Sequence, residues 1–215
     1  MSASKTKGMT DMTQDRVARA TLGRLPDYLQ YIRSIETDTI SSTRIAKALG
    51  LGEVQVRKDL ASVCGKGRPK IGYETARLIS DLEEILGVHD CRGAVIIGAG
   101  RLGLALLGYK GFLEYGIEIK AAFDKDDSKT GKTSDGLPVY NVNECADFCR
   151  DNNIRLALLT VPAAAAQEAC DVVTGAVVTA ILNFAPCKLK TPENVTVRQE
   201  NLALSLAHLN LAATP

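Results

Sequence analysis

Two kinds of hydrophobic periodicity divide this chain. Up to about residue 86, apolar residues recur every three or four positions, as in Leu25, Tyr28, Leu29 and Ile32, which is the spacing of amphipathic helices. Beyond about residue 91, short apolar runs alternate with helical patterns, which is typical of βαβ units and a parallel sheet. We therefore predict a helical domain followed by an α/β domain.

The helical part contains the pattern of a helix-turn-helix. Ser41 or Ser42 can cap a short helix that ends before the tight turn at 50–52, and a second helix follows over 53–61. Apolar residues four apart face inward on this second helix and leave a polar, basic outer face. A recognition helix needs such a face to contact phosphates and base edges in a major groove, although a plain helical hairpin would share the spacing.

A glycine-rich, basic segment over 64–73 follows the second helix. Ile71 and Tyr73 alternate like strand residues, so we predict a wing of two short strands with a basic tip rather than a linker. A helix over 74–86 closes the domain, with four inward residues: Ala76, Ile79, Leu82 and Leu86.

The α/β part opens on a glycine-rich turn. A strand ending at Ile97 leads into the sequence GAGRLG, residues 98–103, and a helix is expected to run to about Tyr115. In a dinucleotide-binding turn, the first glycine allows a tight turn, the second lets the backbone approach a pyrophosphate, and the third lets the helix pack on its strand. A lone GxGxxG is weak evidence, because glycines also recur in ordinary turns.

Residues at the ends of the other strands support a dinucleotide site. Asp124 follows the second strand, 21 residues after Gly103, where a carboxylate accepts hydrogen bonds from an adenosine ribose and repels a 2′-phosphate. This favours NAD(H) over NADP(H). Further strands are expected over 154–159 and 177–182, and in a doubly wound sheet ligands bind beyond the carboxyl ends of the strands. The predicted cofactor-binding residues are Gly98, Ala99, Gly100, Arg101, Leu102, Gly103, Asp124, Lys125, Thr160, Val161, Pro162, Asn183, Phe184 and Ala185.

The charge distribution separates the two parts. The whole chain has a net charge of +1, but residues 1–75 carry +5 and the remainder −4. A basic segment on an acidic body suggests a polyanionic partner for that segment alone, and we predict double-stranded operator DNA. The predicted DNA-binding residues are Ser42, Arg44, Gln55, Arg57, Lys58, Lys66, Arg68 and Lys70.

Composition excludes several other classes of protein. No apolar run approaches the roughly 20 residues that span a bilayer, and the first residues lack a signal-peptide core, so we expect a cytoplasmic protein without a membrane partner. The six cysteines form no CxxC pair and the two histidines stand apart, so no metal site is expected.

The leucine-rich segment over 199–211 has a wider apolar stripe than one surface helix buries, which favours a dimer contact.

Candidates for catalysis are few. A hydride-transfer enzyme needs an acid or base beside the substrate carbonyl, but His89 precedes the α/β domain and His208 lies in the tail. We therefore predict a regulator and not an enzyme. Three alternatives remain: an NAD-dependent dehydrogenase with a helical appendage, a DNA-binding protein that senses oxidants through Cys64, and an NAD-bound scaffold whose DNA binding does not respond to the cofactor.

From about Arg16 to Leu211, the chain resembles the Rex family of redox-sensing transcriptional repressors. The order of the matching motifs is specific, and they are Leu25-Pro26 with Tyr28-Leu29, Ser41-Ser42, Gln55-Val56-Arg57-Lys58-Asp59-Leu60, Gly72-Tyr73, GAGRLG, Tyr109 before Gly111-Phe112, Ala121-Ala122-Phe123-Asp124, Val161-Pro162, Ala166-Gln167, and Ile181-Leu182-Asn183-Phe184-Ala185-Pro186. Three segments depart from the family pattern: residues 62–66 replace an aromatic-rich approach to the wing, Arg101 stands where asparagine is frequent, and Asn201 stands where aspartate is common.

The resemblance implies an α/β fold class with a flexible arm (1–13), a winged-helix domain (14–86), a Rossmann-type doubly wound parallel sheet (87–198) and a swapped C-terminal dimerisation helix (199–215). It also implies a homodimer whose two DNA-binding heads fit two half-sites. In this family, NADH binding releases operator DNA and NAD⁺ permits binding, so the expected function is repression that reports the NADH/NAD⁺ ratio.

Overall fold

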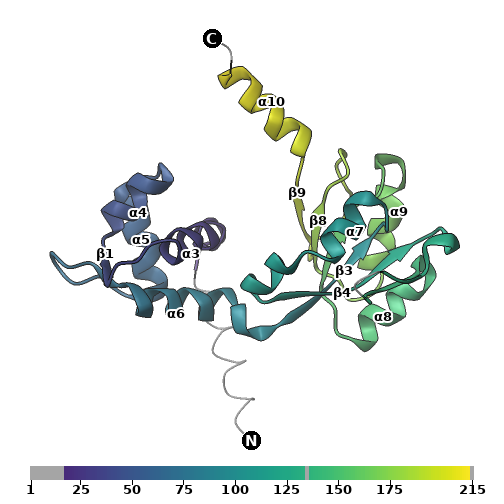
Figure 1. Ribbon diagram of the computed structural model, residues 1–215, viewed down its shortest axis with the longest axis horizontal. Helices are drawn as coiled ribbons and strands as arrows, with labels where there is room; N and C mark the ends of the chain where they lie inside the picture. Colours follow the sequence, from purple (N-terminus) through teal and green to yellow (C-terminus); the bar gives the residue numbers. More distant parts are fainter. Residues whose placement is uncertain (1–16, 134–135, 214–215) are drawn as a thin grey trace, which may run out of the picture. The chain divides into compact units, whose positions relative to one another are not determined.

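The computed structural model describes residues 17–133 and 136–213 (Figure 1). The chain divides into two compact units between Asp90 and Cys91. The sequence places this boundary after Leu86, but a short 3-10 helix, η1 (Val88–Asp90), still belongs to the first unit. The predicted arm at 1–13 lies outside the described residues.

Short helices and one two-stranded sheet form the first unit. In chain order, its elements before η1 are α2 (Arg19–Leu22), α3 (Leu25–Arg33), β1 (Thr39–Ile40), α4 (Ser42–Leu49), α5 (Glu53–Cys64), β2 (Tyr73–Glu74) and α6 (Thr75–Leu86). Pro26 stands in the first turn of α3, where its missing N–H leaves no helical bond unmade. The side chains of α3 that the sequence pattern turns inward are all buried, and they pack with α4, α5 and α6 around one core.

The inward face of α6 differs from the sequence prediction. Its buried residues are Thr75, Leu78, Leu82 and Ile85, whereas Ala76 is exposed and Ile79 is half-buried. The helix begins at Thr75, whose N–H donates to the carbonyl of Asp38, the residue before β1. This bond holds Thr75 at the start of the inward face. Periodicity alone is compatible with either of two adjacent sets of residues facing the core.

The wing is built differently from the two strands that the sequence predicts. Strand β2 pairs with β1 in antiparallel register, with Thr39 opposite Glu74 and Ile40 opposite Tyr73. The loop between α5 and β2 is closed only by an isolated bridge between Arg68 and Gly72. The basic segment is therefore a tight loop on a short sheet.

The second unit contains a seven-stranded sheet in the order β5-β6-β4-β3-β7-β8-β9. Its strands are β3 (Arg92–Ile97), β4 (Ile117–Asp124), β5 (Gly131–Lys132), β6 (Pro138–Asn141), β7 (Leu156–Leu159), β8 (Ala180–Asn183) and β9 (Thr196–Gln199). All neighbouring pairs are parallel except β5 with β6. Omitting β5, the order is third, second, first, fourth, fifth, sixth along the chain, which is that of a Rossmann-type sheet.

Alternate residues of each strand enter two separate cores, one on each face of the sheet. Val95 and Ile97 of β3 pack with α8 (Cys145–Asp151) and α9 (Ala163–Thr174). Ala94 and Ile96 pack on the other face, with Leu107 of α7 (Arg101–Leu107). Because both faces are covered, the central strands read as continuous apolar runs in the sequence.

Several predicted boundaries are wrong in this unit. The helix after the glycine turn ends at Leu107 and a 3-10 segment, η2 (Lys110–Tyr115), replaces its expected last turns. The fourth predicted strand begins at Ala180, not at residue 177. Two more 3-10 turns complete the unit, η3 (Asp127–Lys129) and η4 (Val142–Glu144).

The last helix, α10 (Leu202–Ala212), follows β9 directly. Leu202, Leu204, Leu206 and Leu209 are 52 to 68% exposed, so apolar side chains cover several sides of this helix without being buried in the chain itself. Among the described residues, the structure has no helix with the length and apolar character to cross a membrane.

Candidate functional site

The glycine turn joins β3 to α7 at the carboxyl edge of the sheet. Gly98 has φ +105°, and a Cβ there would lie 2.8 Å from Val161 Cγ1 and 3.1 Å from the Thr160 backbone. A Cβ on Gly103 would lie 1.9 Å from the Gly98 carbonyl oxygen, so only glycine lets α7 start this close to the strand. Both positions therefore require glycine for the turn itself.

Gly100 is different, because nothing lies within 4 Å of where its Cβ would be. The backbone at this position faces open space and can be approached by a ligand. The neighbouring Arg101 and Leu102 are exposed, while Ala99 is buried with its N–H directed at Asp124. The turn thus combines two glycines that the packing demands with one that the packing does not demand and that leaves room for a close approach from outside.

Asp124 ends β4 beside this turn and is 8% exposed. Its Oδ2 accepts from the Ala99 N–H at 2.8 Å and from Lys129 Nζ at 3.0 Å, and its Oδ1 accepts from the Asp126 N–H at 3.0 Å. Burial opposes ionisation, but these donors outweigh it and hold the pKa of the carboxyl below its ordinary value. Asp124 is therefore an ionised carboxylate with one acceptor position still open on Oδ1.

Thr160, Val161 and Pro162 follow β7, the neighbour of β3 on the other side. The Thr160 hydroxyl lies 2.7 Å from the Gly98 carbonyl and 3.1 Å from the Ile97 carbonyl, and its N–H donates to the Ile97 carbonyl at 2.9 Å. These bonds fix the loop after β7 against the glycine turn. The strand order reverses between β3 and β7, and such a switch point is where open α/β sheets bind ligands.

The next loop contains Asn183, Phe184 and Ala185. Asn183 is fully buried, and its amide bonds the Ala185 N–H, the Ala185 and Cys187 carbonyls, and the Gln199 side chain. The sequence analysis places Asn183 in contact with a cofactor, but its side chain is engaged inside the protein. Its observed role is to shape the loop in which Phe184 is half-buried and Ala185 is buried.

Gln199 is a residue that sequence reasoning missed. Its amide nitrogen donates to the Asn183 carbonyl at 3.0 Å and to the Ala185 carbonyl at 2.7 Å. The register of β8 and β9 places Gln199 opposite Asn183, and no local pattern in the sequence reveals that pairing. The strand that precedes α10 is thereby tied to the loop after β8.

The predicted DNA-binding side chains of the helix-turn-helix lie on α4 and α5. Arg44, Gln55, Arg57 and Lys58 are exposed, whereas Val56 and Leu60 on the inner face of α5 are buried. Ser41 caps α4, since its Oγ accepts from the Arg44 N–H at 3.2 Å. Ser42, the first residue of α4, is half-buried.

Asp59 anchors α5 from its inner face. This carboxylate is 5% exposed and accepts from Thr21 Oγ1 and Tyr28 Oη, each at 2.8 Å. Arg24 donates to it twice, from Nε at 2.8 Å and from Nη2 at 2.9 Å. Burial opposes ionisation, but the donors, led by Arg24, hold the pKa of Asp59 below its ordinary value. Four donors match the four lone-pair positions of the carboxylate, so α5 is held rigidly against α2 and α3.

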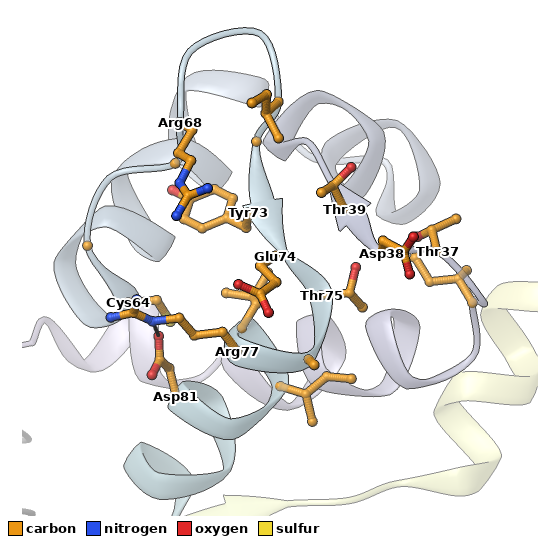
Figure 2. A pocket seen from close by; sticks show the side chains of 18 of the residues that line it. Thr37, Asp38, Thr39, Cys64, Arg68, Tyr73, Glu74, Thr75, Arg77 and Asp81 are labelled. Atoms are coloured by element: carbon orange, nitrogen blue, oxygen red, sulfur yellow. Dashed lines mark ion pairs between the residues drawn. The ribbon is translucent and has the colours of Figure 1, made fainter.

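Lys66, Arg68 and Lys70 are all exposed on the wing loop. Between this loop and α6 lies a pocket of about 1110 Å³ (Figure 2). Its lining mixes charges of both signs: Figure 2 shows Arg68 directed toward the Tyr73 ring and Arg77 paired with Asp81, at 4.0 Å. None of the glycine-turn residues lines this pocket, so it is separate from the nucleotide-type site.

The remaining candidates for chemistry are metal-ligating side chains, the histidines and Cys64. Within residues 17–133 and 136–213, no three side chains of the types that ligate metals gather together. His89 lies in η1 and His208 in α10, and neither follows a strand of the sheet. Burial raises the pKa of the Cys64 thiol to about 12, so little reactive thiolate is present at neutral pH.

Comparison with known proteins decides the family. Residues 16–61 match a model described as "Putative DNA-binding protein N-terminus", and residues 92–187 match one described as "CoA binding domain". The redox-sensing transcriptional repressor Rex of Treponema denticola is 41% identical over 204 residues, covering 93% of this chain and 97% of that protein. This chain belongs to the Rex family.

Solved structures of a Rex-family repressor named RSP share the fold. RSP in complex with beta-NAD⁺ and operator DNA aligns with a TM-score of 0.83 at 32% identity, over 91% of this chain and 92% of RSP. RSP in complex with beta-NADH aligns with a TM-score of 0.81 at 31% identity, over 91% and 93%. These matches confirm the Rex resemblance and the expected fold, a DNA-binding domain followed by a Rossmann-type sheet. Rex proteins are redox-sensing transcriptional repressors, that is, regulators of transcription.

Proposed function

We propose that this Rex protein binds operator DNA as a homodimer through α5 and the wing, and that it leaves DNA when NADH occupies the site at the glycine turn. The observation that carries the proposal is the open backbone at Gly100 beside the ionised carboxylate of Asp124, in a chain whose other unit exposes a basic helix-turn-helix. The solved RSP complexes support both ligands. Since a repressor acts where its operator is, the proposal places the protein in the cytoplasm.

The residues present fit NAD(H). Gly98 and Gly103 bring α7 close to β3, and the open face of Gly100 admits a pyrophosphate against the backbone. Asp124 keeps one free acceptor position on Oδ1, and a second becomes free on Oδ2 when Lys129 withdraws. Two acceptor positions are what a ribose diol needs, and the negative charge disfavours a 2′-phosphate.

The redox state is proposed to be read by the loops after β7 and β8. The ring of NADH is neutral and puckered, whereas the ring of NAD⁺ is planar and cationic. Val161, Pro162 and Phe184 offer mostly apolar surface there, and we assign them the contact with the ring, whereas the predicted Ala185 is buried. A ligand shifts a two-state equilibrium only by its differential affinity for the two states, so these three residues must favour one dimer state when the ring is neutral.

The same site is proposed to hold its ligand without catalysing hydride transfer. No histidine of the described chain follows a strand of the sheet, and the residues directly after β7 and at the end of β8, 160–162 and 183–186, bring hydroxyl, apolar and amide groups rather than a carboxylate, an amine or an imidazole. Steady hydride turnover with any member of a panel of alcohols, aldehydes and 2-hydroxy acids would contradict this assignment.

Operator titration tests the proposal directly. Binding of the full-length dimer to selected operator DNA is measured without ligand and with saturating NAD⁺, NADH, NADPH and coenzyme A. We expect NADH alone to weaken binding by roughly 5- to 150-fold, the usual range of allosteric coupling. If NADH changes nothing while DNA is bound specifically, the protein is a repressor without this switch.

A further inference from the structure

Arg24 connects the buried anchor of α5 to its exposed face. Its Nε and Nη2 donate to Asp59, as described above. Gln55 stands one turn before Asp59 on the same helix, with its side chain exposed. Because the groups facing the inner end of the Gln55 amide are all donors of Arg24, that end is assigned as Oε1, at 3.1 Å from Nη1 and 3.2 Å from both Nη2 and Nε.

The three distances define the geometry of this contact. An oxygen in the plane of a guanidinium group is close to at most two of its nitrogens, whereas Oε1 is nearly equidistant from all three. Oε1 therefore lies over the face of the Arg24 guanidinium. The partial negative charge of the oxygen is attracted to that cation, and the reverse orientation would place the NH₂ group against it.

This orientation leaves the NH₂ group of Gln55 directed away from Arg24. Gln55 is the third residue of α5, and the first turns of a recognition helix are the part that reaches base edges. A freely rotating glutamine reads adenine with both ends of its amide, donating to N7 and accepting from N6. With its oxygen drawn onto the face of Arg24, Gln55 presents its NH₂ end to DNA and acts as a donor.

We infer that Arg24 makes Gln55 a hydrogen-bond donor toward DNA and thereby sets the base preference at one operator position. The inference rests on the proposed function, since it concerns how the same helix reads DNA. The bases that suit a donor are guanine, with acceptors N7 and O6, and thymine, with acceptor O4. Cytosine presents a donor at that edge and is rejected, and adenine loses the second of its two bonds.

The test is selection from a randomised double-stranded DNA library by the full-length protein. Wild type is expected to show one position per half-site where guanine or thymine exceeds adenine and cytosine by about tenfold. In Gln55→Met, which lacks the amide, that position becomes indifferent to base. In Arg24→Lys, the ammonium still pairs with Asp59 but cannot cover Oε1, so adenine rises to the level of guanine.

Matched variants separate the roles. Arg33→Lys makes the same change at the other end of α3, at an arginine that pairs with Glu83, and is expected to keep the wild-type preference. Gln55→Glu keeps Arg24 and Asp59 in place but replaces the NH₂ donor by an oxygen. It should move the preference to cytosine and adenine, whose amino groups donate, and it serves if Arg24→Lys does not fold.

Three outcomes overturn the inference. One is a preference in Arg24→Lys equal to that of wild type, and another is an unchanged preference in Gln55→Met. Retention of guanine or thymine by Gln55→Glu is the third. If wild type selects no sequence at all, the proposed function itself fails, whereas specific selection with an unaltered Arg24→Lys pattern defeats only the role of Arg24.

Discussion

Asp59 and Asp124 are both buried, and both are held ionised by the donors around them. They differ in what remains free. Donors from Arg24, Tyr28 and Thr21 occupy all four acceptor positions of Asp59, so it can only support structure. Asp124 keeps a position on Oδ1 and shares another with the partly exposed amine of Lys129, so it can still take a ligand. The difference between an anchor and a binding group is here a count of unused lone pairs.

Lys129 competes for the carboxylate that we assign to the ribose. Replacing Lys129 by Met should tighten binding of NAD⁺ and NADH alike by up to about fivefold, because the ion pair that must open is partly exposed. Calorimetric titration of each ligand measures this, with Lys120→Met as the control at a lysine of β4 that pairs with Glu118 and not with Asp124. Weaker binding in Lys129→Met would mean that the lysine contacts the ligand instead of excluding it.

The ionised state of Asp59 makes stability depend on pH. Because the folded-state pKa is lowered, the unfolded chain binds more protons, and the stabilisation is present above about pH 4 and lost as pH falls through the folded-state value. The thermal stability of the first unit should therefore fall steeply below about pH 4. Asp59→Asn should remove much of this dependence while destabilising that unit by about 3 to 5 kcal/mol, because it breaks a buried pair with Arg24.

Local patterns predict the residues that face inward on α3 and α5 and the glycines of the turn. They do not predict the partners of Asp59, since Thr21 and Arg24 stand 38 and 35 residues away in the chain. Gln199 is hidden for the same reason, because its contact with Asn183 follows from strand pairing. Asn183 itself has the right position for a ligand contact, but only the structure reveals that its amide is already bonded.

Among the elements, α4 follows the sequence closely because caps fix both of its ends: Ser41 begins it and Gly50, in the left-handed region, ends it. Strand ends are harder to predict. β8 begins three residues later than its apolar run, since a strand exists only where its neighbour pairs with it, and β7 reaches no further back than Leu156. The wing has almost no strand of its own for the same reason.

The wing is proposed to contact phosphates, which carry no sequence information. Lys66→Ala should weaken operator binding and reduce the slope of log affinity against log salt by about one, with base preference unchanged. Filter binding at several salt concentrations gives the slope. Lys188→Ala, at an exposed lysine of the second unit, is the control. An unaltered slope in Lys66→Ala would remove that residue from the DNA contact.

Helix α10 exposes four leucines that no other element buries within the described chain. Helices that are apolar on several sides are normally buried, and we propose that a second subunit covers this one. Leu206→Glu should convert the dimer to monomers, as sedimentation velocity would reveal, whereas Asn152→Glu at the exposed end of α8 should not. A stable dimer in Leu206→Glu would place the subunit contact elsewhere.

At the N-terminus of α10, Asn201 accepts from the Leu204 N–H at 3.0 Å. An aspartate at this position would cap the helix equally well, so the asparagine changes charge and not helix geometry. Any effect of this departure from the family pattern on the redox switch is therefore electrostatic.

For the whole molecule, the proposed switch is a coupling between two sites in different units. Thermodynamic linkage requires that the coupling be reciprocal. If saturating NADH weakens operator binding by a given factor, saturating operator must weaken NADH binding by that same factor. Fluorescence titration of NADH with and without operator DNA measures the second quantity, and scrambled DNA is the control. Unequal factors would indicate a third linked equilibrium, such as dissociation of the dimer.

The bond network around Gln199 has a mechanical consequence. Gln199 ties the loop after β8 to the end of β9, and α10 begins only three residues later. The eleven residues of α10 form an arm about 16 Å long. A tilt of about 10° at its base therefore displaces its tip by about 3 Å, given that length. The loop that we assign to the ring of the ligand therefore acts at the base of α10. A small movement of this loop is amplified along the helix that carries the exposed leucines.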